Sequence, residues 1–401
     1  MYFKSYNKNE CSGCTACMSA CPKATITMQE DSEGFFYPHI DEDTCIHCGV
    51  CQKVCSWEHP QYANSMEPIT LATVLKDKAE RQKSTSGGVF YAIARWIIEQ
   101  GGVVYGAAFD EKLQLHHIDA DNLEDFQRLR GSKYIQSNLG HIFKEVRWQL
   151  EQGRWCYFTG TGCQVAGLKA YLRKDYEKLL CSDVVCHGVP SQKLFNEHIA
   201  YMEEKYHDKV VGYQFRDNKM GGYCEMCYFE GRKPVVNPTY CLSPFLYSFM
   251  YGYTHRYSCY ECKFAKVPRQ GDITLADYWG IKHFFPQIDY SIGCSLVLIN
   301  THKGEEIWDQ VKENFDYCIS KVEDASRYNR NVVSPSEMPE LRANIYKEIS
   351  DKGYAYVAEN CFKAPHYYRI KLSSTIVRMG IMQFPLKVYR KLKTLILRKR
   401  S

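Results

Sequence analysis

Two stretches of the sequence decide how the chain begins to fold, CSGCTACMSACP at residues 11–22 and CIHCGVCQKVCS at residues 45–56. Both space their cysteines as the bacterial ferredoxins with two [4Fe–4S] clusters do. In those proteins three thiolates of one run hold one cluster, and the fourth reaches across to the other cluster. The spacing predicts one cluster on Cys11, Cys14, Cys17 and Cys55, and a second on Cys45, Cys48, Cys51 and Cys21.

Crossed ligation explains how so short a segment could fold. About 55 residues bury too little apolar surface to be stable alone, whereas two clusters that each bind both halves would serve as a core. Structural zinc is one alternative, but zinc modules show two separated pairs of cysteines instead of runs of four. Disulfides are another, and residues 1–10 lack the basic and then apolar pattern of a secretory signal. The spacing favours iron and sulfur over both alternatives.

Composition places the remainder of the chain among globular proteins. Of its 401 residues, 45% are hydrophobic and 24% charged, and the length suits two or three domains. No apolar run approaches the length that spans a bilayer. Twenty cysteines without a signal peptide indicate metal binding in a reducing compartment. We therefore expect a cytoplasmic protein.

Charge is distributed unevenly along the chain. Residues 1–60 contain four Lys or Arg against eight Asp or Glu, whereas residues 361–401 contain eleven Lys or Arg and no acid. The acidic start suits a basic redox partner protein, and nothing indicates a nucleic-acid partner. From Lys371 to Ser401 a basic apolar stripe predicts a helix that either contacts an anionic membrane surface or packs on the protein itself. The sequence predicts no oligomeric state.

The middle of the chain alternates predicted strands and helices. Strands are expected at residues 103–109, 113–118, 155–158 and 179–186. Helices are expected before Gly101, from residue 139, after the loop of residues 159–164 and from about residue 193. Ser86 and Asn138 are the expected N-caps of the first two helices. This alternation predicts an α+β or α/β fold, a small ferredoxin-like domain followed by a larger α/β domain. The predicted boundaries are 1–60 for the ferredoxin-like domain, 61–82 for a linker, 83–330 for the larger domain and 331–401 for a helical, basic tail.

Four further cysteines suggest a third metal site. Cys163 and Cys186 each follow a predicted strand, at the sheet edge where cofactors bind in α/β folds, and Cys259 and Cys262 form a C-x2-C pair. A single C-x2-C pair also fits a redox pair or half of a zinc site. Cys224 and Cys227 have the same spacing but lie in a predicted strand, where thiols are usually packing residues.

Several segments, in their order along the chain, resemble the coenzyme F420 hydrogenase/dehydrogenase beta-subunit family. They are Ser86-Gly87-Gly88, residues 131–137 (GSKYIQS), residues 160–164 (GTGCQ), residues 185–191 (VCHGVPS) and Cys259-x2-Cys262-Lys263-Phe264. The resemblance implies a flavin, FAD in better-known members, with a further [4Fe–4S] cluster beside it. It also implies two-electron exchange with a deazaflavin such as coenzyme F420 or with another soluble partner. Gly162 departs from the pattern, because the family commonly has proline there.

The resemblance guides the choice of flavin-binding residues. We expect the flavin to be held by Ser86, Gly87, Gly88, Lys133, Tyr134 and Gln136, with the pyrophosphate at the helix start and Lys133 neutralising its charge. The preferred hypothesis is an iron–sulfur flavoprotein oxidoreductase with three [4Fe–4S] clusters and FAD. The alternative is an electron-transfer subunit without its own substrate, which serves a partner enzyme, for example in surface-polysaccharide synthesis. No catalytic residue is predicted.

Overall fold

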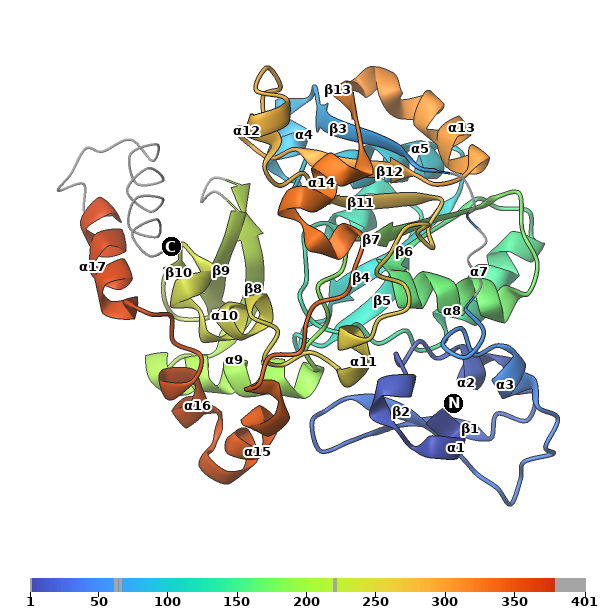
Figure 1. Cartoon of the computed structure of the whole chain (residues 1–401), viewed down its shortest axis with the longest axis horizontal. Coiled ribbons are helices and arrows are strands. Elements are labelled where there is room, and N and C mark those ends of the chain that lie inside the picture. Colours follow the sequence, from blue (N-terminus) through green and yellow to red (C-terminus); the bar gives the residue numbers. More distant parts are fainter. Residues whose placement is uncertain (1, 61–63, 65–66, 219–221, 379–401) are drawn as a thin grey trace.

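The structure is a computed structural model that describes residues 2–60, 64, 67–218 and 222–378. Its largest feature is an eight-stranded sheet in the order β13-β3-β12-β11-β7-β6-β4-β5 (Figure 1). The strands are β3 (Ile69–Leu75), β4 (Val103–Phe109), β5 (Leu115–Ala120), β6 (Cys156–Thr161), β7 (Leu179–Val184), β11 (Ile273–Asp277), β12 (Ser295–Ile299) and β13 (Phe315–Ser320). Strands β11, β7, β6 and β4 are parallel, and the others pair antiparallel. This mixed α/β sheet, preceded by a small cysteine-rich region, confirms the predicted fold class.

Helices cover both faces of the sheet. On one face lie α5 (Val89–Glu99) and α13 (His302–Val311), and on the other lie α7 (Ile142–Glu151) and α8 (Gly162–Leu172). Successive residues of a strand point to opposite faces. Accordingly Tyr157 of β6 packs in the core beneath α5, whereas its neighbours Cys156 and Phe158 pack in the core beneath α7 and α8. Strands that are buried on both faces explain the nearly continuous apolar runs at these positions.

The N-terminal region rests on the face covered by α8. It contains α1 (Tyr2–Ser5), α2 (Ala16–Ala20), the hairpin β1 (Ile26–Glu30) and β2 (Phe36–Ile40), and α3 (Val50–Lys53). Ala16 and Val54 are fully buried in the same apolar cluster as residues of α7 and α8. The ferredoxin-like region therefore shares a hydrophobic core with the large sheet instead of standing apart from it (Figure 1).

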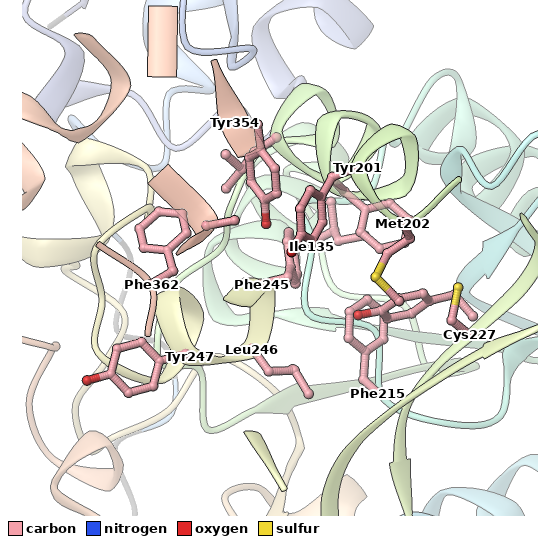
Figure 2. Packing of buried hydrophobic residues seen from close by; sticks show 14 of the residues in the cluster. Ile135, Tyr201, Met202, Phe215, Cys227, Phe245, Leu246, Tyr247, Tyr354 and Phe362 are labelled. Carbon is pink, nitrogen blue, oxygen red and sulfur yellow. The ribbon is translucent and has the colours of Figure 1, made fainter. Parts of the chain in front are cut away.

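A second, smaller sheet lies beside the first. It is built from β8 (Val210–Asp217), β9 (Gly222–Phe229) and β10 (Val235–Asn237), with α9 (Gln192–Tyr206), α10 (Pro244–Met250), α15 (Arg342–Lys352) and α16 (Tyr354–Asn360) around it. Figure 2 shows the apolar core between these elements, in which Tyr201 lies beside Tyr354 and Phe215 lies nearer to Met202 and Cys227. A fully buried contact between His198 Nε2 and Glu225 Oε1, at 2.7 Å, links α9 to β9.

The remaining helices lie between or after these units. They are α4 (Lys78–Gln82), α6 (Leu123–Phe126), α11 (Tyr257–Tyr260), α12 (Ile281–Phe284), α14 (Val322–Tyr328) and α17 (Tyr367–Arg378). Among the described residues no helix is both long and apolar enough to cross a membrane. The predicted helical stripe after residue 385 lies outside the described residues, so its membrane contact stays a prediction.

Three local expectations are wrong. Residues 69–75, expected in a linker, form β3, which pairs with both β12 and β13 and is almost wholly buried. Ser86 does not cap α5, because the N-cap is Gly88 at φ +92° and the Ser86 hydroxyl donates to Cys294 O instead. Asn138 does not cap α7, which begins after His141. Strand β3 was not predicted from the sequence, because polar residues flank it and both of its partner strands lie far away along the chain.

Candidate functional site

The first predicted set of cluster ligands converges in the structure. Burial raises the pKa of Cys17 well above its ordinary value, and the neighbouring thiols of Cys14, Cys11 and Cys55 raise it further. These are the four cysteines that the spacing assigns to cluster one, including the one that crosses over from the second run. In the second set, burial raises the pKa of Cys51, with contributions from Cys48 and Cys21.

The two cluster sites differ in their exposure. Cys14 packs against the apolar core of the large domain, whereas Cys48 is exposed and the nearby Ile46 is 55% exposed. The loop around Cys45 and Cys48 also carries exposed acidic residues at 41–43. Cluster one would thus be enclosed, and cluster two would lie at the surface.

The four cysteines of the predicted third site line one cavity of about 50 Å³. Burial raises the pKa of Cys163 to about 12 and that of Cys186 and Cys262 to about 11, and it raises the pKa of Cys259 well above its ordinary value. The neighbouring thiols of Cys163, Cys186 and Cys262 also raise the pKa of Cys259, so the four thiols lie close together around this cavity. Thiols that resist ionisation when buried become thiolates when a metal binds them. Four sulfur donors around one cavity fit an iron–sulfur cluster.

Cluster one and the third site adjoin across α8. Cys163 lies in the first turn of α8, and a Cβ placed on Gly167, one turn later, would lie 2.9 Å from the Sγ of Cys14. Trp57 and Phe264 pack edge to face at 6.0 Å in an apolar cluster that also includes Cys55, Cys163 and Cys262. Cysteines of both sites therefore border the same small patch of apolar side chains.

Arg256 ties the ferredoxin-like region to this site. The buried guanidinium donates from Nε to Cys11 O at 2.7 Å and from Nη2 to Phe36 O at 3.0 Å, and it stacks 4.0 Å from the ring centroid of Tyr37. Its Nη1 donates to Gln136 Oε1 at 3.3 Å, and Gln136 Nε2 donates to Ser12 O at 2.9 Å. Gln136 thus lies at the interface with cluster one, and it does not line the larger cavity described next.

A larger cavity of about 330 Å³ opens at the carboxyl ends of β6, β7 and β11. Four of the six predicted flavin residues line it, Ser86, Gly88, Lys133 and Tyr134. Gly87 does not line it, but only glycine fits at this position, because a Cβ at Gly87 would lie 2.3 Å from Thr73 O. The start of α5 faces this cavity without a side-chain cap, so that its first N–H groups can bind a ligand.

Lys133 is held inside the protein. Its Nζ donates to the carbonyls of Arg128, Leu129 and Arg130 at 2.8 to 3.1 Å. Burial lowers the pKa of Lys133 to about 7. An anion in the cavity would favour its protonated form, so the side chain fits the role of neutralising a pyrophosphate.

The two cavities share a wall. Thr161, Gln164, Cys186 and Gly188 line both the small cavity with the four thiols and the larger one. Gln164 Oε1 accepts from Thr161 N at 3.0 Å, which fixes the loop between β6 and α8. A group in the larger cavity would therefore be separated from the third cysteine site by single residues.

Sequence reasoning missed the far wall of the larger cavity. Arg216, Tyr223, Asp277 and Trp279 all line it. The segments Phe215-Arg216-Asp217 and Asp277-Tyr278-Trp279-Gly280 stand out in the sequence, but nothing in it indicates that β8, β9 and β11 meet.

Comparison with known families agrees with this geometry. Residues 153–325 match the family described as the C terminus of the coenzyme F420 hydrogenase/dehydrogenase beta subunit, and residues 10–58 match the 4Fe-4S dicluster domain. Matches to both families thus lie in one polypeptide. The resemblance predicted from the sequence is thereby confirmed, and the protein is an iron–sulfur protein related to F420-linked oxidoreductases.

Individual relatives are distant. The chain is 23% identical over 78% of its length to a coenzyme F420-dependent sulfite reductase of Methanocaldococcus jannaschii, of which it covers 48%. It is 21% identical over 76% of its length to an F(420)H(2) dehydrogenase subunit of Methanosarcina mazei, of which it covers 83%. Among solved structures, a chain of the F420-reducing [NiFe] hydrogenase complex from Methanosarcina barkeri shares 20% identity at a TM-score of 0.44, covering 74% of this chain and 94% of that one. The protein therefore spans about half of the sulfite reductase.

Proposed function

We propose that the protein is an iron–sulfur flavoprotein oxidoreductase that passes electrons between its ferredoxin-type clusters and a flavin, which exchanges hydride with a soluble coenzyme or substrate. The observation that supports this most directly is the shared wall, since Cys186, Thr161 and Gln164 border both the third cysteine site and the larger cavity. A bound flavin supplies the exchange of two electrons with a substrate and of single electrons with a cluster.

The residues of the larger cavity have distinct tasks in this proposal. The N–H groups at the start of α5 bind the pyrophosphate, and the positive charge of Lys133, whose N–H donors serve three backbone carbonyls, offsets part of its negative charge. Gly87 and Gly88 let the helix start lie against β3, because a Cβ on either would collide with Thr73 or Leu75. Gln136 is reassigned from the flavin to the interface between Arg256 and Ser12.

The order of the cysteine sites suggests the electron path. The Cys45 to Cys51 loop is at the surface, cluster one is enclosed, and cluster one adjoins the third site through α8. Electrons would enter or leave at the exposed cluster, where exposed acids at residues 41–43 suit a basic partner protein. Which direction they flow depends on the potentials of the clusters.

The alternative function is an electron-transfer subunit without its own substrate. Flavin content separates the two, so the decisive experiment is anaerobic purification of the full chain followed by release of flavin with acid. About one flavin per chain, together with reduction of that flavin by chemically reduced clusters, is the expected result. A fully iron-loaded chain without flavin would support the electron-transfer subunit and contradict the proposal.

A further inference from the structure

Arg256 differs from the other fully buried arginines in having no acidic partner. Each of the others lies 2.5 to 3.3 Å from a carboxylate oxygen, in the pairs Arg81 with Asp289, Arg269 with Asp183 and Arg342 with Glu33. Arg256 is 1% exposed, and no carboxylate of the described residues lies within ion-pair distance of its guanidinium. A buried charge costs free energy unless an opposite charge lies nearby.

The contacts of Arg256 satisfy its hydrogen-bond donors but not its charge. Nε, Nη1 and Nη2 donate to Cys11 O, Gln136 Oε1 and Phe36 O, and all three acceptors are uncharged. The guanidinium carbon lies 4.0 Å from the ring centroid of Tyr37, a cation–π contact that offsets only part of the cost of burial. The arginine therefore still requires an anion close to it.

Arg256 borders both enclosed cysteine sites. It lines the small cavity that the four cysteines of the third site share. It also lies against the loop of residues 11–14, where a Cβ on Gly13 would stand 3.1 Å from its Nη1. Burial raises the pKa of Cys11 and that of Cys163, and in both the positive charge of Arg256 acts in the opposite direction. The field of this one cation thus reaches ligands of both sites.

We propose that Arg256 is the shared counter-ion of cluster one and the third cluster and raises the reduction potentials of both. The inference rests on the cysteine sites of the proposed function and is independent of the flavin. Four thiolates make such a cluster an anion, and each one-electron reduction adds a negative charge. A buried cation stabilises the reduced form more than the oxidised form, because little water screens it. Arg256 itself exchanges neither an electron nor a proton.

The exposed cluster provides an internal reference. Cys48 is exposed, and the loop around it carries the exposed acids at residues 41–43. Negative charges and water near a cluster do not favour the addition of an electron in the way that a buried cation does. Arg256 should therefore raise the potentials of the two inner clusters relative to the exposed one.

The test is a redox titration of the full chain, purified anaerobically with its clusters and monitored by EPR spectroscopy. Changing Cys259 and Cys262 to serine identifies the signal of the third cluster, and Cys48→Ser identifies that of the exposed cluster. In Arg256→Met the equilibrium constant for reduction of both inner clusters should fall by about tenfold or more, which is about 59 mV for one electron. The exposed cluster should keep its potential. Arg256→Lys retains the charge and should restore most of the loss.

A second variant changes the charge without removing the arginine. Gln136→Glu places a carboxylate beside Nη1 of Arg256 and should lower the same two potentials, although it strengthens the contact that holds the side chain. The matched control is Arg342→Met with Glu33→Gln. It removes a buried pair whose charges already cancel, also at the interface of the ferredoxin-like region, and should shift no potential.

The outcomes distinguish this inference from the proposed function. Unchanged potentials in Arg256→Met and Gln136→Glu would overturn the inference, as would an equal shift of all three clusters or the same shift in the control. A shift confined to one inner cluster would overturn the shared role. If Arg256→Met loses iron, Gln136→Glu decides alone, and a wild type with about eight irons, hence without a third cluster, also overturns the inference. A wild type with three clusters but no flavin contradicts the proposed function, and the titration still decides the role of Arg256.

Discussion

Gly167 of α8 lies directly against Cys14 of the ferredoxin-like region, so that a Cβ added at Gly167 would stand 2.8 Å from the Cβ of Cys14. No side chain larger than hydrogen fits between the helix that begins with Cys163 and the loop that ligates cluster one. Close approach of the two sites thus depends on one glycine.

Replacement of Gly167 by alanine should therefore displace cluster one. Overpacking of this kind typically costs about 1–3 kcal/mol. We expect iron content to fall by about four atoms per chain, the content of one cube, while flavin content stays unchanged. Anaerobic iron and sulfide analysis measures this, and Ala170→Ser on the same helix is the control. A variant with full iron content and unaltered electron transfer between clusters would show that the contact relaxes without consequence.

The third cysteine site predicts about twelve irons per chain, because twelve thiolates form three sets of four. Replacing Cys259 and Cys262 with serine should reduce this to about eight and slow electron transfer to the flavin. The control is the pair Cys224→Ala and Cys227→Ala, which has the same spacing but lies fully buried in β9. If the wild type contains eight irons and the serine variant the same number, there is no third cluster.

Lys133 should make flavin binding depend on pH. The pKa of Lys133 in the folded protein is about 7, below the ordinary 10.5. Above pH 7 the lysine must therefore take up a proton when the pyrophosphate binds, and this protonation costs binding free energy. Flavin should bind more tightly below pH 7 than at pH 9. In Lys133→Ala, occupancy should fall and lose this pH dependence, while the N-terminal clusters remain. Lys178→Ala is the control, since Lys178 also donates to a backbone carbonyl, that of Gly153, at 2.9 Å but lies outside the cavity.

Lys133 also affects the stability of the flavin-free protein. Between pH 7 and 10.5 the unfolded chain binds a proton at this lysine that the folded chain does not. The free energy of unfolding should therefore rise with pH across this window, and the Lys133→Ala variant should lack that part of the slope. Denaturant titrations at several pH values measure it. An identical pH slope in variant and wild type would mean that Lys133 is charged in the folded state.

Arg342 should hold the ferredoxin-like region in place. The fully buried guanidinium bonds both carboxylate oxygens of Glu33, at 3.1 and 2.5 Å, and donates to His255 O at 2.8 Å. Breaking such a pair from one side costs roughly 3–5 kcal/mol. Arg342→Met should expose residues 1–60 to limited proteolysis, and the added change Glu33→Gln should restore part of the protection. The exposed pair of Arg330 and Glu337 offers a control, because Arg330→Met should have no effect.

The sequence alone determined features that depend on local spacing. Cysteine intervals predicted the cluster sites, because a cluster's ligands must come from adjacent turns and loops, and the structure gathers Cys11, Cys14 and Cys17 with Cys55 accordingly. Nearly continuous apolar runs predicted β4, β6 and β7 close to their observed bounds, since strands buried on both faces leave a strong local signal.

Only the tertiary structure decided which distant segments meet. Residues 69–75, which were expected in the linker, form strand β3 of the large sheet, because pairing with β12 and β13 satisfies the backbone groups of this strand. Gln136, which was expected to bind the flavin, instead accepts a hydrogen bond from Arg256. Arg216 of β8 forms an ion pair with Asp277 of β11. The last two contacts join residues 120 and 61 positions apart, and such pairings depend on how strands and helices pack, which no local pattern encodes.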